Sequence, residues 1–64
     1  MKLDKKKLML AMANACMNTA DIQAATGMPR PTLNGAISGK TIRPATAGKI
    51  AKALGVNVSD ILAD

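Results

Sequence analysis

Residues 17–39 have the sequence MNTADIQAATGMPRPTLNGAISG, and this stretch decides the fold. It begins like a helix, because Asn18 is a favourable N-cap residue and Asp21, at the third helical position, can accept a hydrogen bond from the cap amide in return. Gly27 then supplies the left-handed conformation in which helices commonly end. The stretch therefore predicts a short helix over residues 18–26 that is closed by a turn.

A second short helix is predicted over residues 30–38, after the turn at Met28-Pro29. Pro31 is tolerated in the first turn of a helix, because the amide that it lacks would have no helical partner there. Gly39 ends the segment. The apolar side chains fall on one side of the helix and define its expected buried face: Leu33, Ala36 and Ile37.

The same periodicity extends the helical pattern on both sides of this pair. A helix from about Asp4 to Cys16 is predicted by Leu8, Ala11, Met12 and Ala15. A helix that ends at Gly55 is predicted by Ala47, Ile50, Ala51 and Leu54. The helix-start signature then recurs at Asn57 and Asp60, which predicts a fifth helix from Val58 to about Ala63.

Together these segments predict an all-α fold of five helices, built as one domain over residues 1–64. No alternating pattern typical of strands interrupts it. The chain is 48% hydrophobic and has no aromatic residue, so its core must consist of Leu, Ile, Val, Met and Ala. Because a chain this short buries only about 60% of its unfolded surface, closely packed short helices are the expected solution.

The charge of the chain favours a polyanionic partner. Nine Lys and Arg stand against four acidic residues, which gives a net charge of +5, and no acid occurs between Ile22 and Ser59. An ordinary solvated basic surface would have the same composition, so charge alone does not distinguish the two interpretations.

The residue types that are missing argue against several other functions. With one cysteine, Cys16, and no His, we expect no disulfide, metal site or cofactor, and we expect Cys16 to be an inert residue near a packed face. Without His, Glu or Tyr no general acid and base pair is apparent, so the chain is not expected to be an enzyme. We also expect a cytoplasmic protein, with no membrane partner and no evident small-molecule ligand.

Two short helices joined by a turn allow one helix to lie in a DNA major groove while its neighbour contacts the backbone. The outward side of the segment 30–38 is small, polar and free of acid. Arg30 and Asn34 are the expected base-contacting residues, because Arg can bond guanine and Asn can bond adenine in bidentate fashion. The other outward or flanking residues are Pro31, Thr32, Gly35 and Ser38.

Gly35 is unusual inside a helix, where Gly costs about 1 kcal/mol relative to Ala. One hypothesis is that the bare backbone lets the helix approach DNA closely; the alternative is a tolerated weakness. At the start of the preceding helix, the Asn18 cap and the Thr19 hydroxyl are candidates to bind a backbone phosphate. Gln23 could contact phosphate, brace Arg30, or have no role.

The ordered set of these motifs resembles the helix-turn-helix regulators of the Cro and lambdoid phage repressor type, also called the XRE family. The resemblance covers about residues 15–62. It rests on Asn18-Thr19, on Gly27-Met28 at the turn, on Ser38-Gly39-Lys40-Thr41 with Arg43-Pro44, and on Ala53-Leu54-Gly55-Val56 followed by Val58, Asp60, Ile61 and Leu62. Many relatives have Ala at the position of Gln23 and a Ser or Thr cap at that of Pro29.

The resemblance implies a lambda-repressor-like fold and a regulator, most often a repressor of phage or mobile-element origin, that binds double-stranded operator DNA as a homodimer on a palindrome. It implies base contacts from Arg30, Pro31, Thr32, Asn34 and Gly35. It also implies phosphate contacts from Thr19, Ser38, Lys40, Thr41 and Arg43, with Arg43 able to reach the minor groove.

Some alternatives stay open at the level of the sequence. The chain could be an antitoxin-like or other protein-binding module whose basic face is incidental, and RNA binding is disfavoured because no aromatic side chain is available to stack on unpaired bases. An apolar patch of Leu54, Val56, Ile61 and Leu62 could serve dimerisation or simply belong to the core.

Overall fold

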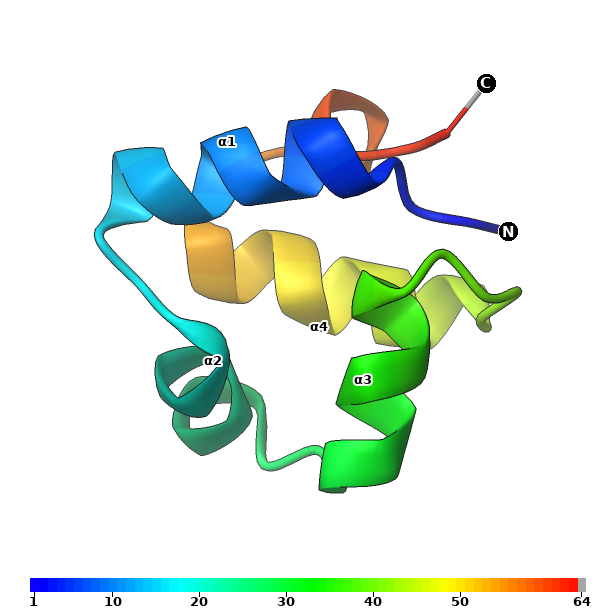
Figure 1. The fold of residues 1–64 in the computed structure, drawn as a ribbon, viewed down its shortest axis with the longest axis horizontal. Helices are drawn as coiled ribbons and strands as arrows, with labels where there is room; N and C mark the ends of the chain where they lie inside the picture. The colour runs from blue at the N-terminus through cyan, green and yellow to red at the C-terminus, as the bar shows by residue number, and fades with distance from the viewer. Residues whose placement is uncertain (64) are drawn as a thin grey trace.

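A computed structural model describes residues 1–63, so that Asp64, the end of the predicted domain, lies outside the described residues. Within that part the chain forms four α-helices, α1 (Lys5–Ala15), α2 (Thr19–Thr26), α3 (Arg30–Ile37) and α4 (Pro44–Leu54), followed by one 3-10 turn, η1 (Val58–Asp60). The all-α class expected from the sequence is confirmed, with one α-helix fewer than predicted. Figure 1 shows α4 running across the middle of the molecule, with α1 on one side and α2 and α3 on the other.

The helix ends follow the capping residues. Asn18 and Asp21 form a reciprocal capping box, in which the Asp21 amide donates to Asn18 Oδ1 at 2.9 Å and the Asn18 amide donates to Asp21 Oδ2 at 2.9 Å. Gly27 and Gly55 end α2 and α4 in the left-handed conformation, as predicted. The predicted limits of α2 and the predicted end of α4 therefore agree with the structure to within a residue or two.

Cys16 does not lie where the sequence analysis placed it. It ends α1 as the C-cap residue in the left-handed conformation, with a φ of 56°, and its side chain is exposed. The apolar face of α1 is instead turned inward through Leu8 and Ala11. Because the chain turns away at Cys16 toward α2, the helical periodicity that predicted a packed thiol no longer applies at this residue.

The core surrounds α4, whose inward residues are Ala47, Ile50, Ala51 and Leu54, all buried as predicted. The remaining helices, the N-terminal segment, the turn between α2 and α3 and the residue after η1 add side chains with at most 7% exposure to this cluster, namely Leu3, Leu8, Ala11, Ile22, Met28, Leu33, Ala36 and Ile61. Leu33 and Ala36 of α3 are fully buried. Their burial fixes the rotation of α3, and hence the side that it presents to solvent.

The predicted fifth helix is wrong beyond Asp60. The chain makes only the turn η1, and Ile61 then leaves helical geometry with φ −122°. The reason is a tertiary pairing: the Asp4 amide donates to the Ile61 carbonyl at 2.9 Å and the Ala63 amide donates to the Lys2 carbonyl at 3.0 Å, on either side of an antiparallel bridge between Leu3 and Leu62. Backbone groups used in this bridge cannot continue a helix.

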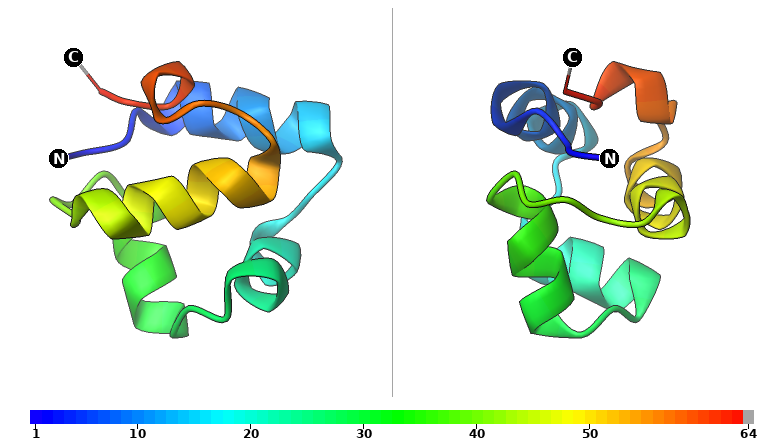
Figure 2. Two further views of the ribbon diagram at one scale, coloured as in Figure 1. Left: turned by 180° about the vertical axis from the view of Figure 1, so that it is seen from behind. Right: turned by 90° about the vertical axis from the view of Figure 1, so that its right-hand side faces the viewer.

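This pairing brings the two ends of the described chain together, as both views in Figure 2 show. It also buries Leu3 and Ile61, which are 2% and 0% exposed. None of the helices found within residues 1–63 has both the length and the apolar character needed to cross a membrane.

Candidate nucleic-acid interface

The α2–α3 pair has the geometry of a helix-turn-helix. After Gly27 the turn passes through Met28, which is buried, and Pro29, whose carbonyl accepts the first helical hydrogen bond of α3 from the Leu33 amide at 3.1 Å. α3 begins at Arg30, and Pro31 lies in its first turn. In Figure 1 α3 stands at the edge of the molecule, so that one long side of it is accessible.

The accessible side of α3 carries the residues that the sequence analysis assigned to base contacts. Four of them are exposed: Arg30, Pro31, Thr32 and Asn34. Gly35 is half-buried, because the Lys40 side chain lies over it; a Cβ built on Gly35 would be 3.8 Å from Lys40 Cδ. The helix thus offers a surface with short side chains and one long cation at its N-terminal end.

Arg30 does not extend freely into solvent. Its Nη1 donates a hydrogen bond of 3.0 Å to Oε1 of Gln23, which lies on α2. The sequence left the role of Gln23 open between phosphate contact, support of Arg30 and no role, and the structure shows the supporting contact. The guanidinium is therefore held between the two helices of the motif.

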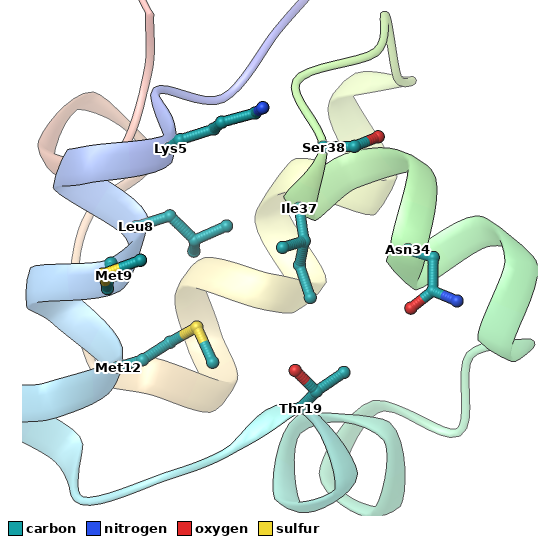
Figure 3. A pocket seen from close by; sticks show the side chains of 8 residues that line it. All are labelled: Lys5, Leu8, Met9, Met12, Thr19, Asn34, Ile37 and Ser38. Carbon is teal, nitrogen blue, oxygen red and sulfur yellow. The ribbon is translucent and has the colours of Figure 1, made fainter.

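At the start of α2, the capping box limits which backbone amides could donate a hydrogen bond to a phosphate. The amides of Asn18 and Asp21 are already bonded within the box, so the amides of the first turn that remain are those of Thr19 and Ala20. The side chain of Thr19 is half-buried and points into the space between α1 and α3 (Figure 3). Of the two candidates here, Thr19 therefore offers both an amide and a hydroxyl, whereas Asn18 acts mainly as a cap.

The loop after α3 carries the basic residues. Ser38 is the C-cap, and its hydroxyl donates to the Gly35 carbonyl at 3.0 Å. Gly39 follows with a φ of +88°, a conformation that turns the chain back so that the Lys40 amide also donates to the Gly35 carbonyl at 3.0 Å. The loop therefore folds against the end of α3 and leaves Lys40, Thr41 and Arg43 exposed.

A hollow of about 540 Å³ lies between α3 and this loop. It is lined by Pro31, Thr32, Gly35, Lys40, Thr41, Ile42, Arg43 and Thr46. The charged residues among these are two cations, Lys40 and Arg43, and six of the eight were already predicted contacts from α3 or the loop. Thr46 was missed by the sequence analysis. Its place at the third position of α4, two residues after Pro44, is the signal that could have indicated it.

The loop is also tied to the N-terminal segment. The Ile42 amide donates to the Met1 carbonyl at 2.7 Å, and the Met1 nitrogen donates to the Ile42 carbonyl at 2.9 Å. Lys40 and Arg43 flank this pairing. Thr19 lines one hollow with Asn34 and Ser38, so that the start of α2, the outward side of α3 and the loop form one connected surface. We call this surface the α3 face; it consists of Thr19, Arg30, Pro31, Thr32, Asn34, Gly35, Ser38, Lys40, Thr41, Arg43 and Thr46.

Comparison with known proteins agrees with this geometry. The family model of the Cro/C1-type HTH DNA-binding domain matches residues 7–64, which confirms the family resemblance inferred from the motifs. None of the curated proteins matches the sequence significantly. Among solved structures, a mutant of hydroxyethylphosphonate dioxygenase matches all of this chain, with a TM-score of 0.82 and 30% identity. PhpD with cadmium and hydroxyethylphosphonate matches with a TM-score of 0.80, also at 30% identity.

These solved structures correct one expectation. This chain covers 14% of each of the matched chains, and the first of them carries the name of an enzyme. The expectation that the chain is not an enzyme is therefore contradicted, since a domain like this one occurs inside a dioxygenase. The absence of His, Glu and Tyr from a domain does not exclude an enzyme, because the residues that catalyse a reaction can lie in another part of the same protein.

Proposed function

This chain belongs to the family of Cro/C1-type helix-turn-helix DNA-binding domains, and we propose that it represses transcription by occupying an operator sequence. The observation that carries the proposal is the α3 face, where exposed short side chains lie beside Lys40 and Arg43 in a hollow whose described lining contains no acid, with Arg30 exposed at the start of α3. Repression requires only that the bound protein exclude other proteins from the same DNA.

Base recognition is assigned to the outward side of α3. In this proposal Arg30 bonds guanine O6 and N7, and Asn34, one turn further along, bonds adenine N6 and N7; each such pair discriminates against a wrong base by about 1 to 3 kcal/mol. Pro31, Thr32 and Gly35 add van der Waals contacts. Support comes from the exposure of Arg30 and Asn34 and from burial of the opposite side of α3.

Phosphate recognition is assigned to the two edges of the α3 face. One edge is the start of α2, where Thr19 supplies a hydroxyl and an amide. Gln23 was a candidate phosphate contact from the sequence. Because it already accepts a hydrogen bond from Arg30, we assign it to the support of Arg30 instead. The other edge is the loop, with Ser38, Lys40, Thr41 and Arg43, to which we add Thr46. Contacts of this kind set the register of the protein on the duplex but not its sequence preference.

We propose that two copies bind a palindromic site, one α3 in each half-site. The apolar patch considered for dimerisation is smaller than the sequence indicated, because Leu54 and Ile61 are buried in the core and only Val56 and Leu62 remain half-exposed. With a net charge of +5, free copies also repel one another. Assembly on DNA, where phosphates neutralise this charge, fits these facts better than a preformed dimer.

Selection from a random duplex pool, followed by titration of the enriched duplex at several salt concentrations, tests the proposal. We expect a palindrome, affinity that falls steeply with salt, and loss of sequence preference in a variant carrying Arg30→Ala and Asn34→Ala. Lys52→Ala is the control, because Lys52 is exposed on α4 outside the α3 face. Enrichment of no consensus, with equally weak binding to all duplexes, would refute operator recognition and favour a protein partner.

A further inference from the structure

A second hollow lies beside the α3 face, between α1 and α3, and the family assignment leaves it unexplained. It has a volume of about 520 Å³. Figure 3 shows that its walls come from α1 on one side and α3 on the other, with the start of α2 at one end. We call it the α1–α3 groove. Its size falls within the range of about 300 to 1,000 Å³ that small-molecule sites occupy.

The floor of the groove is apolar. It consists of Leu8, Met9 and Met12 from α1 and Ile37 from α3. Met9 is 69% exposed, although removing a large apolar side chain from water is energetically favourable. Methionine side chains are flexible and polarisable, so that Met9 and Met12 can adapt to the shape of an apolar ligand.

The rim of the groove is polar and carries one positive charge. Thr19, Asn34 and Ser38 supply hydroxyl and amide groups, and Lys5 is the only charged residue among the described residues of the lining. Lys5 extends from α1 toward Ser38 in Figure 3, and its Cε would lie 3.8 Å from a Cβ built on Gly39. An apolar floor with a single cation at its edge is complementary to an apolar molecule that bears a single negative charge.

We propose that the α1–α3 groove binds a small amphiphilic anion, with its acidic group at Lys5 and its apolar part over Met9 and Met12. The single cation of the lining argues for a small molecule, because an acidic protein segment would use several cations in a row. A second copy of the chain is disfavoured, since each copy has a net charge of +5 and the lining contains no acid.

The groove shares residues with the proposed DNA surface. Thr19, Asn34 and Ser38 belong both to its rim and to the predicted contacts with phosphates and bases. A ligand in the groove would occupy these side chains and place negative charge beside α3, where the DNA backbone must come. We therefore infer that the ligand and DNA exclude each other, so that the anion acts as an inducer. This regulatory step rests on the proposed function, whereas ligand binding itself does not.

Methionine methyl NMR tests occupancy of the groove without DNA. The chain has five methionines, of which Met9 and Met12 line the groove, while Met1, Met17 and Met28 do not. With octanoate as the probe, we expect saturable shifts of the Met9 and Met12 methyl signals and none of the other three. Octan-1-ol and octylammonium, which have the same chain but lack the negative charge, should cause weaker shifts.

Two pairs of matched variants localise the ligand. Met9→Gln should raise the Kd for octanoate roughly fivefold through lost apolar contact, whereas Leu10→Gln changes a neighbouring side chain that is 58% exposed outside the groove and should not. Lys5→Gln should abolish the preference for octanoate over octan-1-ol, whereas Lys6→Gln should retain it. All four side chains are exposed, so that these substitutions leave the core intact.

Titration of the enriched duplex with octanoate present tests the regulatory step. A mutually exclusive ligand raises the apparent Kd for DNA by a factor of 1 + [L]/Kd, or about tenfold when the ligand is at ten times its own Kd. Met9→Gln should reduce this effect, and Leu10→Gln should not. If the wild-type chain bound no duplex specifically, the proposed function would fail, but the methyl shifts would still decide whether the groove binds an anion.

Several results would overturn the proposal. Absence of saturable Met9 and Met12 shifts, equal shifts of all five methionines, or equal binding of octylammonium would each refute an anion site. Shifts that depend on protein concentration alone would assign the groove to self-association instead. If an amphipathic peptide of Leu and Glu shifted these signals and octanoate did not, the partner would be a protein. Octanoate binding without any change in affinity for DNA would refute the role as an inducer.

Discussion

Arg30 enters the proposed interface already hydrogen-bonded to Gln23 of the neighbouring helix. A long cation that is free in solution loses about 0.5 to 1.5 kcal/mol of side-chain entropy when binding immobilises it. The contact with Gln23 removes part of that loss before DNA arrives. Because the bond is exposed, it contributes little to folding, and its effect belongs to binding.

The first prediction concerns Gln23→Ala. We expect the affinity for the enriched duplex to fall by roughly twofold to tenfold, because Arg30 must then be ordered at the expense of binding free energy. Urea denaturation should show an unchanged free energy of unfolding. If the affinity stayed the same or increased, the hydrogen bond would instead be an obstacle that Arg30 must break to reach a base.

The second prediction concerns Gly35→Ala. The nearest atom to a new Cβ would be Lys40 Cδ at 3.8 Å, an ordinary van der Waals contact. The substitution should therefore stabilise the fold by about 1 kcal/mol through helix propensity, and it should weaken DNA binding because the added methyl group holds α3 away from the bases. A gain in stability with unchanged affinity would show that Gly35 is only a tolerated weakness.

At the scale of elements, the short helices depend on their ends. α2 has eight residues, and an isolated helix of that length is unstable in water. Its capping box satisfies the amides of Asn18 and Asp21. Ile22 is buried in the core, and α2 packs against α4. The α3–α4 loop depends similarly on short-range hydrogen bonds to the Gly35 carbonyl.

The third prediction compares Asn18→Ala with Asn14→Ala. Loss of the cap should lower the free energy of unfolding by about 0.5 to 2 kcal/mol. Asn14 is exposed inside α1 and caps nothing, so its replacement by Ala, a better helix former, should not destabilise the chain. Thermal denaturation of the two variants measures the difference. Equal stabilities would mean that packing of Ile22 alone holds α2.

The fourth prediction concerns the α3–α4 loop. Lys40→Ala should reduce the slope of log K against log salt by about one, as expected for the loss of one phosphate contact, while the preferred sequence stays the same. Lys52→Ala removes the same charge from α4, outside the α3 face, and should leave the slope nearly unchanged. Equal slopes for the two variants would remove Lys40 from the interface.

At the scale of the whole molecule, the two ends of the chain support both the core and the loop. Residues 1–4 pair with residues 61–63 on one side and with Ile42 on the other. Leu3, at 2% exposure, anchors this segment in the core. A terminal segment is usually poorly ordered unless it is tied down in this way.

The fifth prediction follows from this anchoring. Leu3→Ala should destabilise the fold by about 2 to 5 kcal/mol, the range for a buried Leu, even though the residue lies near the start of the chain. Leu10→Ala, at 58% exposure, is the matched control and should change stability by less than about 0.5 kcal/mol. Urea denaturation distinguishes them. A small effect of Leu3→Ala would show that residues 1–4 fray without loss of the core.

Much of the fold could be predicted from the sequence, because helix caps and helical faces depend on residues a few positions apart. Asn18 with Asp21, the glycines at the helix ends and the spacing of Leu33 and Ala36 are all local features, and the structure confirms each of them. The outward side of α3 followed from the same spacing. Which of its residues contact DNA stays a prediction.

Features that depend on distant partners could not be predicted in this way. The capping box of Asn57 and Asp60 forms within one 3-10 turn. The pairing of residues 61–63 with residues 2–4 then prevents the helix from continuing. The same reason applies to the exposure of Cys16, to the place of Thr46 in the hollow and to the α1–α3 groove. The sequence by itself determined the starts, the glycine-capped ends and the apolar sides of the central helices, since those choices are local. Only the tertiary structure decided which surfaces meet and where the last helix stops, because that depends on how separate segments pack.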